Sequence, residues 1–260
     1  RSAISNSKAY KLARRKNYFL TIESVSSFEQ IVSTLEMILR YPIHRISSTF
    51  LWPKILTKIC GGRLRFPISG GGAIAPHIDS FFEALGIELL VGYGLTETSP
   101  VLTCRRPWRN IRGGAGQPLP HTEIKIVDPE TFHIRKLRQK GLVLARGPQI
   151  MSGYLGKQSE SKKVLDDNGW FNTGDLGMLL ADGSLILTGR AKDTIVLSSG
   201  ENIEPGPLEE CLIACPLIEQ ALLLGQDQKH LAALIVPRIE NLKAWLEDRG
   251  FDSKIVLGLS

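Results

Sequence analysis

The sequence predicts an α/β protein in which an α/β sheet unit is followed by a small antiparallel sheet or barrel and then by a small α+β unit. Three observations support this class. Between residues 69 and 98 a glycine-rich loop leads into a helix and then into a short apolar strand. From residue 107 short alternating strands are separated by turns. The charged segment 189–193 then lies between apolar strands, so we expect one domain over residues 1–189 and a second over 190–260.

The first 66 residues combine basic clusters with a predicted helix over residues 28–46. Ile31, Leu35, Ile38 and Leu39 recur there at helical spacing. A basic amphipathic helix fits two roles: it covers a domain core with its charges in solvent, or it contacts an anionic membrane surface. No apolar run approaches the ~20 residues that span a bilayer, so we expect a soluble or peripheral protein.

The next segment predicts an α/β unit. Residues 69–75 form a glycine-rich loop, and Pro76 suits the first turn of a helix whose apolar residues recur until Leu85. Residues 87–91 then form a short apolar strand, which we expect to stop at the loop of residues 92–98.

Strands dominate after this unit. Residues 123–127 alternate in polarity, residues 142–145 are bounded by glycines, and Asp182-Gly183 predicts a hairpin turn before strand 185–187.

The distal part predicts a helix, two strands at 221–224 and 231–236, and a helix at 240–249. Cys211 and Cys215 are expected on the core-facing side of the first of these helices, with Leu208 and Leu212. This pair of cysteines lacks the second pair that a zinc site needs.

Composition excludes several functions. The chain has 260 residues with 32 Lys and Arg against 26 Asp and Glu, a net charge of +6, which permits contact with nucleotide phosphates, acidic proteins, nucleic acid or anionic membrane. Basic and aromatic residues are not interleaved and no recognised motif is present, so we expect no nucleic-acid binding. The four cysteines fit a reduced compartment, and the five histidines lack the neighbours of a triad or zincin motif.

The segment 92–97 is the first candidate site, because α/β sheets bind ligands beyond the carboxyl ends of strands. Its glycines let backbone approach a flat ligand, and Tyr93 offers a ring for stacking a base. Thr96 offers a hydroxyl for phosphate, and Glu97 a hard oxygen for Mg²⁺. The alternative is a turn with a core tyrosine and a surface glutamate.

The glycine-rich loop formally matches a dinucleotide fingerprint at Gly70, Gly72 and Ala75. The match is poor, because the preceding segment contains Pro67 and Glu88 comes too early for the acidic residue. We therefore expect a tight turn that approaches some other ligand.

Two further candidates remain open on local evidence. Asp175 lies between glycines, where a carboxylate can accept both hydroxyls of a ribose or belong to a turn. Arg190 and Lys192 at the predicted boundary are either solvated charges or contacts to phosphate and sugar beside a hinge.

In combination, four ordered motifs resemble those of the adenylate-forming superfamily. They are residues 69–73, 92–100, 169–177, and 189–193 with 200–203. The resemblance covers the chain from residue 60 onward. Residues 105–110, 194–197 and 225–228 are most similar to long-chain acyl-carrier-protein synthetases of cyanobacteria and plastids.

The resemblance implies the distal part of a large adenylate-forming domain followed by the beginning of a mobile C-terminal domain. It also implies an activity: a long-chain fatty acid attacks the α-phosphate of ATP, and the acyl-adenylate passes its acyl group to the pantetheine thiol of acyl carrier protein. Coenzyme A is the alternative acceptor. ATP and Mg²⁺ are implied, in a cytoplasmic or plastid-stromal location with peripheral membrane contact as a further option.

The same resemblance implies roles for individual residues. Tyr93 would stack on adenine, Thr96 would bond phosphate, Glu97 would hold Mg²⁺, Asp175 would bind the ribose hydroxyls and Arg190 would lie beside them.

Other positions line the same ligands or move between the two steps. Gly71, Gly72 and Ala73 would line the nucleotide and acyl pockets, with Gly94 also at the nucleotide. Lys192 matches the hinge about which the small domain rotates.

Two family elements are absent from this sequence: the Ser/Thr/Gly-rich phosphate loop and the lysine near the C-terminus. We therefore expect the 260 residues alone not to catalyse adenylation. A non-catalytic nucleotide-binding module is the alternative.

Overall fold

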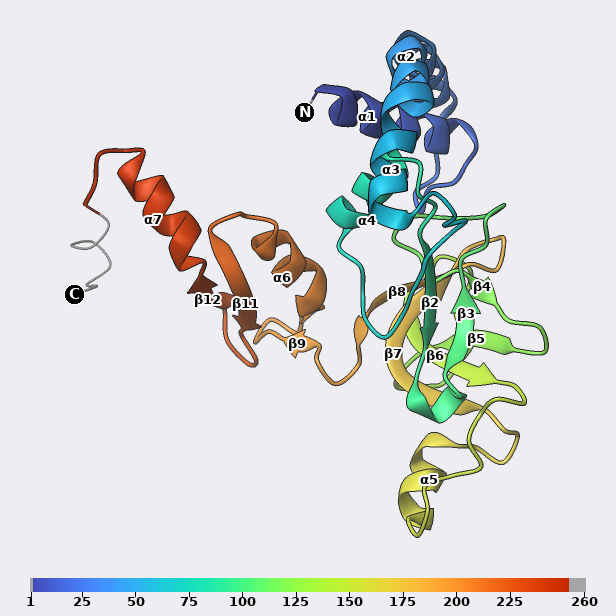
Figure 1. Ribbon diagram of the computed structural model, residues 1–260. Coiled ribbons are helices and arrows are strands. Elements are labelled where there is room, and N and C mark those ends of the chain that lie inside the picture. Colours follow the sequence, from blue (N-terminus) through green and yellow to red (C-terminus); the bar gives the residue numbers. More distant parts are fainter. Residues whose placement is uncertain (1, 253–260) are drawn as a thin grey trace. The chain divides into compact units, whose positions relative to one another are not determined.

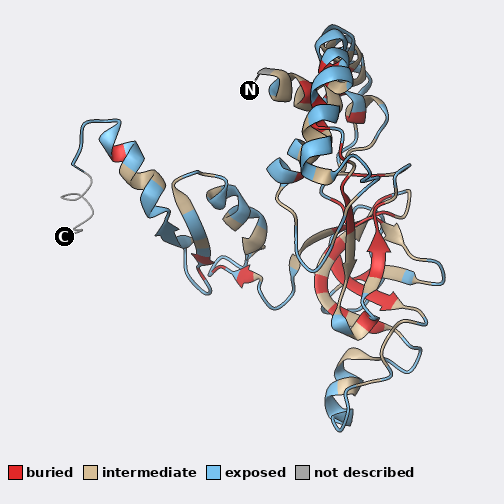
Figure 2. Ribbon diagram, in the orientation of Figure 1, coloured by how far each residue is buried: buried red, intermediate tan, exposed pale blue. Residues whose placement is uncertain are grey.

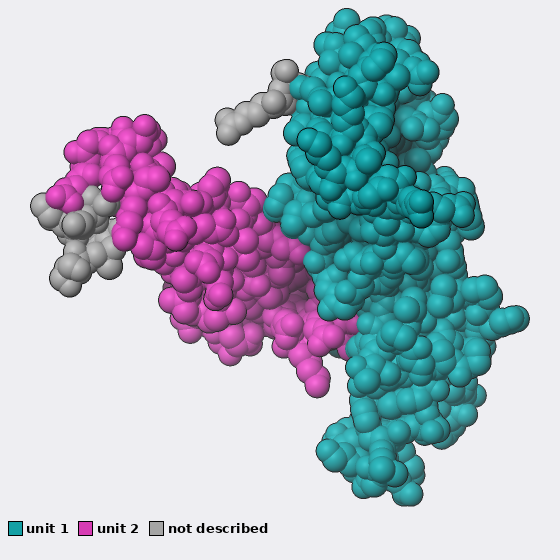
Figure 3. All heavy atoms as spheres, viewed as in Figure 1, with its two compact units in different colours: residues 1–173, 177–187 teal, residues 174–176, 188–260 magenta. Residues whose placement is uncertain are grey.

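The computed structural model describes residues 2–252, whose helices and strands are labelled in Figure 1. The chain divides into two compact units, coloured separately in Figure 3. Unit 1 contains residues 1–173 and 177–187, and unit 2 contains residues 174–176 and 188–260. The division falls near the charged segment on which we based the predicted ranges 1–189 and 190–260, which stay a prediction. Each unit is described by itself below.

Unit 1 begins with helices. They are α1 (Ser2–Asn17), α2 (Ser27–Ile46), the π-helical turn η1 (Ser47–Leu51) and α3 (Trp52–Cys60). Ser26 caps α2 in a capping box with Glu29, and Gly61 ends α3 in the left-handed conformation. The predicted helix over residues 28–46 is confirmed.

The apolar face of α2 is exposed in the described residues. Its buried residues are the polar Ser33 and His44, which lie on the side that packs against α1. Leu35 and Leu39 are 63% and 80% exposed, and Figure 2 shows the exposed colour along much of this helix. Within the described residues polar contacts with α1 decide which face of α2 is buried, and the alternative that the apolar face covers a domain core stays a prediction.

A four-stranded sheet follows, in the order β1-β2-β3-β4. Its elements are β1 (Ile68–Ser69), α4 (Pro76–Ala84), β2 (Leu90–Gly94), the 3-10 turn η2 (Thr96–Thr98), β3 (Val101–Cys104) and β4 (Gln117–Pro118). β1 is parallel to β2, whereas β2–β3 and β3–β4 are antiparallel. The helix that follows the glycine-rich loop is confirmed.

The predicted strand of residues 87–91 has wrong boundaries. It begins at Leu90 and continues through Gly94, because residues 92–94 pair with β3. The predicted stop at Gly92 overlooked this partner strand.

The second sheet of unit 1 has the order β5-β6-β7-β8. Its elements are β5 (Glu123–Val127), β6 (Gly141–Arg146), α5 (Gln158–Val164), β7 (Phe171–Leu179) and β8 (Leu185–Arg190). Strands β5 and β6, predicted at residues 123–127 and 142–145, are antiparallel. Gly183 adopts φ +79° in the predicted hairpin turn. Ile126, Val143 and Leu185 form a core cluster with Ala115, which joins this sheet to the preceding segment.

Unit 2 contains β9 (Ile195–Val196), β10 (Asn202–Ile203), α6 (Pro205–Ile213), β11 (Ile218–Leu224), β12 (Ala232–Pro237) and α7 (Ile239–Glu247). The predicted helices and strands are present with shifted ends. Its core contains Ile195, Leu197 and Leu223, and Leu212 packs against it.

The expectation that Cys211 faces the core is wrong, because it is exposed. It follows from helix geometry that Cys211 points about 100° away from its inward neighbour Leu212. Cys215 is half-buried and lies beyond the end of α6.

Candidate nucleotide site

The glycine-rich loop and the end of β2 lie at one edge of the first sheet. β1 and β2 are parallel neighbours, so the chain leaves both at the same edge. A Cβ atom on Gly70 would lie 3.4 Å from the carbonyl oxygen of Gly92, which shows that the two motifs are adjacent. The structure therefore brings together two segments that the sequence singled out separately, at the edge where α/β sheets bind ligands.

The loop exposes its backbone. Gly71 has φ +82°, and a Cβ atom on Gly71 or Gly72 would meet nothing within 4 Å. Both residues and Ala73 are exposed. Open space beside backbone amides allows a ligand to approach more closely than side chains would permit.

The strand β2 explains why Gly94 is a glycine. A Cβ atom there would lie 1.7 Å from the carbonyl oxygen of Pro100, so the next strand can approach only a residue without a side chain. Tyr93 packs against the cluster that contains Ala115 and Leu185 and stays partly exposed.

The turn after β2 presents Thr96 and Glu97. Thr96 is exposed and Glu97 is partly exposed. Buried Thr98, which the sequence did not single out, holds this turn: its hydroxyl accepts from the backbone N–H of Leu95 at 2.9 Å and bonds the carbonyl of Pro100 at 2.6 Å. Thr98 is thus a positioning residue for its two neighbours.

Tyr154 is a second residue that sequence reasoning missed. Its phenol donates a hydrogen bond to Glu97 Oε1 at 2.9 Å. The backbone N–H of Met151 donates to the Glu97 carbonyl at 2.8 Å, so the segment that carries Tyr154 also holds the backbone of the turn. The hydrogen bond to Glu97 raises the pKa of Tyr154 above its usual value, with burial adding to the effect.

The donor set at Glu97 fits Mg²⁺. Magnesium is usually held by one or two carboxylates together with water and substrate phosphates, rather than by a closed protein cage. Within residues 2–252 no group of three or more His, Cys, Asp or Glu side chains could form such a cage. A single, partly exposed carboxylate suits that mode of binding.

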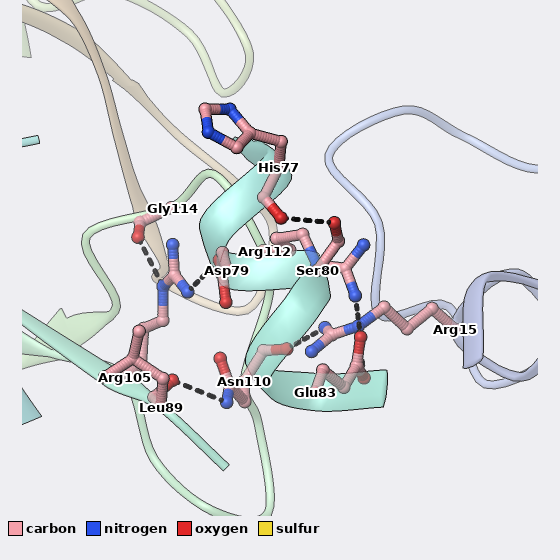
Figure 4. A network of polar contacts seen from close by, with 10 residues as sticks. All are labelled: Arg15, His77, Asp79, Ser80, Glu83, Leu89, Arg105, Asn110, Arg112 and Gly114. Atoms are coloured by element: carbon pink, nitrogen blue, oxygen red, sulfur yellow. Dashed lines mark hydrogen bonds and ion pairs between the residues drawn. The ribbon is translucent and has the colours of Figure 1, made fainter. Parts of the chain in front are cut away.

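A buried polar network supports this edge of the sheet (Figure 4). Asp79 on α4 pairs with Arg105, which follows β3, at 2.7 Å, and their side chains are only 4% and 2% exposed. Arg105 Nε also donates to the Gly114 carbonyl at 2.6 Å. Burial lowers the pKa of Arg105, and the charge of Asp79 opposes this change. The pair therefore joins α4, which begins at the glycine-rich loop, to the strand that partners β2.

The network continues to α1. Arg15 donates to Glu83 at 2.8 Å, and Arg112 pairs with the same carboxylate. Burial lowers the pKa of Arg112 to about 10, helped by the positive charge of Arg15. Asn110 donates to the Leu89 carbonyl at 3.2 Å, just before β2.

Unit 2 contains Asp175 and Arg190, the other residues predicted to bind the nucleotide. Asp175 is buried and lies inside β7, so the alternative that it belongs to a turn is wrong. Arg190 Nε donates to Asp175 Oδ1 at 3.0 Å, while the Arg190 side chain is 61% exposed. Gly174 has φ +73°, and its carbonyl accepts from the N–H of Ala191 at 2.9 Å. A carboxylate fixed by an exposed arginine offers both an acceptor for hydroxyls and a positive charge.

Lys192 is exposed in the turn after Arg190. The Arg190 carbonyl accepts from the N–H of Asp193 at 3.1 Å and from the Thr194 hydroxyl at 3.2 Å. These bonds define the turn at the predicted hinge position.

An open glycine loop and an acidic turn at one edge of an α/β sheet are typical of proteins that bind a ligand at that edge. The chain belongs to the AMP-binding enzyme family, which matches residues 18–155. The family described as AMP-binding enzyme C-terminal domain matches residues 192–253. The resemblance to the adenylate-forming superfamily and the α/β class are confirmed.

Curated relatives agree with this family. A chloroplastic long-chain-fatty-acid–[acyl-carrier-protein] ligase of Arabidopsis thaliana is 45% identical over 212 residues, which are 78% of this chain and 29% of the relative. A long-chain-fatty-acid–CoA ligase of Homo sapiens is 31% identical over 80% of this chain and 30% of the relative. The chain thus spans about three tenths of the length of these relatives.

Solved structures share the fold. An O-succinylbenzoate coenzyme A synthetase of Bacillus subtilis, in complex with ATP and magnesium ion, has a TM-score of 0.60 and 27% sequence identity. The match covers 71% of this chain and 40% of that structure.

Proposed function

We propose that this chain takes part in the ATP-dependent activation of a long-chain fatty acid through an acyl-adenylate, followed by transfer to the pantetheine thiol of acyl carrier protein. The 45% identity to a relative named as an acyl-carrier-protein ligase favours that acceptor. Coenzyme A is the alternative, since a further relative is named as a CoA ligase. The chain's net charge of +6 suits an acidic carrier protein and the phosphates of coenzyme A alike.

The observation that carries the proposal is the contact between the glycine-rich loop and the end of β2, with an acidic turn directly after it. In this arrangement Gly71, Gly72 and Ala73 would offer backbone to the nucleotide, with Gly94 permitting the close strand approach. The exposed hydroxyl of Thr96 would bond phosphate.

Tyr93 and Glu97 would contact opposite ends of the nucleotide. The core cluster behind Tyr93 restricts its ring, so it would offer a fixed surface for the adenine base. Glu97 would hold Mg²⁺, and Tyr154 would fix the direction of the Glu97 carboxylate. When bound, the metal would neutralise charge that develops on the phosphates.

In unit 2, Asp175 would accept the ribose hydroxyls, with Arg190 holding that carboxylate and adding positive charge. Lys192 would lie at the hinge about which the small domain rotates between the two half-reactions. We also propose a plastid-stromal or cytoplasmic location, since the Arabidopsis thaliana ligase and a probable acyl-activating enzyme of the same plant, 44% identical to this chain, are named as chloroplastic. Peripheral membrane contact is a further option for this location.

The test is ATP/pyrophosphate exchange by the protein that the gene encodes, with fatty acids of several lengths. Glu97→Ala should raise the barrier by about 2–4 kcal/mol, as expected for losing one electrostatic contact in the transition state. Tyr154→Phe should have a smaller effect in the same direction, because it removes one hydrogen bond of about 0.5–1.5 kcal/mol. Tyr18→Phe, at an exposed tyrosine, is the matched control. An unchanged rate in Glu97→Ala would remove Glu97 from the metal role.

The acceptor is tested by offering holo acyl carrier protein and coenzyme A separately to the same preparation. Turnover with coenzyme A alone would exclude the carrier-protein assignment. Nucleotide binding without any exchange, for every fatty acid, would favour the non-catalytic module.

A further inference from the structure

A cavity of about 260 Å³ lies at the end of the first sheet that is opposite the candidate nucleotide site. It is lined by residues 86–89, which precede β2, and by Pro107 and Asn110, which follow β3. Because β2 and β3 are antiparallel, these residues meet where β2 begins, whereas Thr96 and Glu97 follow the other end of β2. The cavity is therefore distinct from the nucleotide edge.

Helix α1 supplies cations to this cavity. Lys11, Arg14 and Arg15 line it, and residues 1–22 contain six Lys and Arg but no Asp or Glu. Within residues 2–252, Lys11 forms no hydrogen bond or ion pair, and the one contact of the Arg14 guanidinium is the Tyr18 ring, at 5.7 Å. Both side chains therefore keep their donors available to a ligand.

Positive charge exceeds negative charge around the cavity. The carboxylates that line it are those of Asp79, Glu83 and Glu88. Asp79 pairs with Arg105 at 2.7 Å, and Glu83 pairs with both Arg15 and Arg112, as Figure 4 shows. With the two unpaired cations of α1, the cluster contains five cations and three carboxylates, a net charge of +2.

The pKa values of the neighbouring groups agree with this excess. Burial lowers the pKa of Lys11, and the positive charges of Arg14 and Arg15 lower it further, whereas Glu88 opposes the change. Burial also lowers the pKa of His44 to about 4, helped by the charges of Lys11 and Arg14. An anion in the cavity would offset the repulsion among these cations.

Asn110 adds a hydrogen-bond acceptor to the lining. It is 5% exposed, and its Nδ2 donates to the Leu89 carbonyl at 3.2 Å. Its Oδ1 is buried without a hydrogen-bond partner among the described residues. A buried acceptor without a partner is unfavourable, so this atom favours a ligand that has a donor. The cations favour ligand oxygens, whereas Asn110 favours a hydroxyl.

We propose that this cavity binds a phosphate dianion that also carries one hydroxyl, with its oxygens on Lys11 and Arg14 and its hydroxyl donating to Asn110 Oδ1. Inorganic hydrogenphosphate has both features, because one of its four oxygens is protonated. A small phosphate ester of a polyol has them through its alcohol group. The volume suits such a ligand together with several waters, each of which takes about 30 Å³. This inference does not depend on the proposed function.

The test is isothermal titration calorimetry of the protein that the gene encodes, in chloride buffer at neutral pH. Inorganic phosphate, glycerol phosphate and sulfate are the separate titrants. We expect phosphate to bind roughly tenfold or more tightly than sulfate, which has a similar charge and shape but no hydroxyl. Tighter binding of glycerol phosphate than of inorganic phosphate would assign the site to an ester, and the reverse order to the free ion.

Variants assign the binding to this cavity. Lys11→Gln with Arg14→Gln should weaken phosphate binding roughly tenfold or more, because charge-assisted hydrogen bonds are lost. Lys16→Gln is the matched control on the same helix, since Lys16 lies 4.0 Å from Glu29 and does not line the cavity. The double variant removes no ion pair of the described chain, so it should keep the circular dichroism and urea midpoint of the parent.

Asn110→Ala tests the hydroxyl contact. It should bring the affinities for phosphate and sulfate to within about threefold of each other, because neither anion then has a partner for a donor. ATP should not displace phosphate, because the nucleotide edge lies at the other end of β2.

Three results would overturn the inference. Equal affinity of the parent for phosphate and sulfate would show attraction by charge alone. Unchanged phosphate binding in the Lys11 and Arg14 double variant would exclude the cavity. Displacement of phosphate by ATP would place the phosphate at the nucleotide edge instead.

Discussion

Replacing Asp79 by Asn tests whether the buried network supports the nucleotide edge. The substitution preserves size but leaves the Arg105 guanidinium buried, at 2% exposure, without its 2.7 Å ionic partner. Breaking a buried ion pair from one side typically destabilises a protein by about 3–5 kcal/mol, because a charge is left without compensation. The hydrogen bond from Arg105 to the Gly114 carbonyl remains, so we expect a loss near the lower end, about 3 kcal/mol.

The assay is native-state hydrogen exchange of the Leu90–Gly94 amides in increasing urea, which reports on unit 1 without unit 2. Glu160→Gln is the matched control, since its pair with Lys163 at 2.7 Å is 50% and 67% exposed. An exposed pair contributes less than about 1 kcal/mol.

A double substitution separates charge from shape. Asp79→Leu with Arg105→Met removes both charges, and we expect it to recover most of the stability lost in Asp79→Asn. If Asp79→Asn lowers the free energy of unfolding no more than Glu160→Gln does, the network does not stabilise this edge and the reasoning is refuted.

Three further predictions concern stability and nucleotide binding. Gly94→Ala should destabilise unit 1 by about 1–3 kcal/mol in urea titration, because its Cβ would meet the Pro100 carbonyl at 1.7 Å. Gly72→Ala, where the space is open, should change stability by less than about 0.5 kcal/mol; equal effects would contradict the close approach at β2. Burial lowers the pKa of His44 from 6.5 to about 4, so below pH 6.5 the unfolded chain binds a proton that the folded chain does not. The urea midpoint should therefore decrease as the pH is lowered from 6.5 to 4. His44→Gln should flatten this dependence, whereas a profile identical to that of the parent would refute the assignment. Finally, 2′-deoxy-ATP should bind more weakly than ATP by about 1.5–3 kcal/mol, as measured by calorimetry. Asp175→Asn should abolish most of that difference, and its persistence would exclude Asp175 as the ribose contact.

The sequence indicated where a helix forms more reliably than which of its faces is buried. Apolar periodicity predicted the helix of residues 28–46, since the period of a helix is a local property. It did not predict which side of that helix is buried, because His44 meets Ser7 of α1, which is distant in sequence.

The same distinction applies to strand ends. Residues 92–94 contain two glycines and resemble a loop, but pairing with β3 extends the strand across them. A strand's hydrogen-bond partner is set by tertiary structure rather than by local propensity.

By itself, the sequence indicated several of the helices and strands, the four motifs and the family to which they belong, because spacing and residue type are local information. Only the tertiary structure decided that Tyr154 bonds Glu97 across 57 residues and that Asp79 is a buried partner of Arg105. Both pairs form through chain segments that meet in space, and no periodicity in the sequence encodes such a meeting.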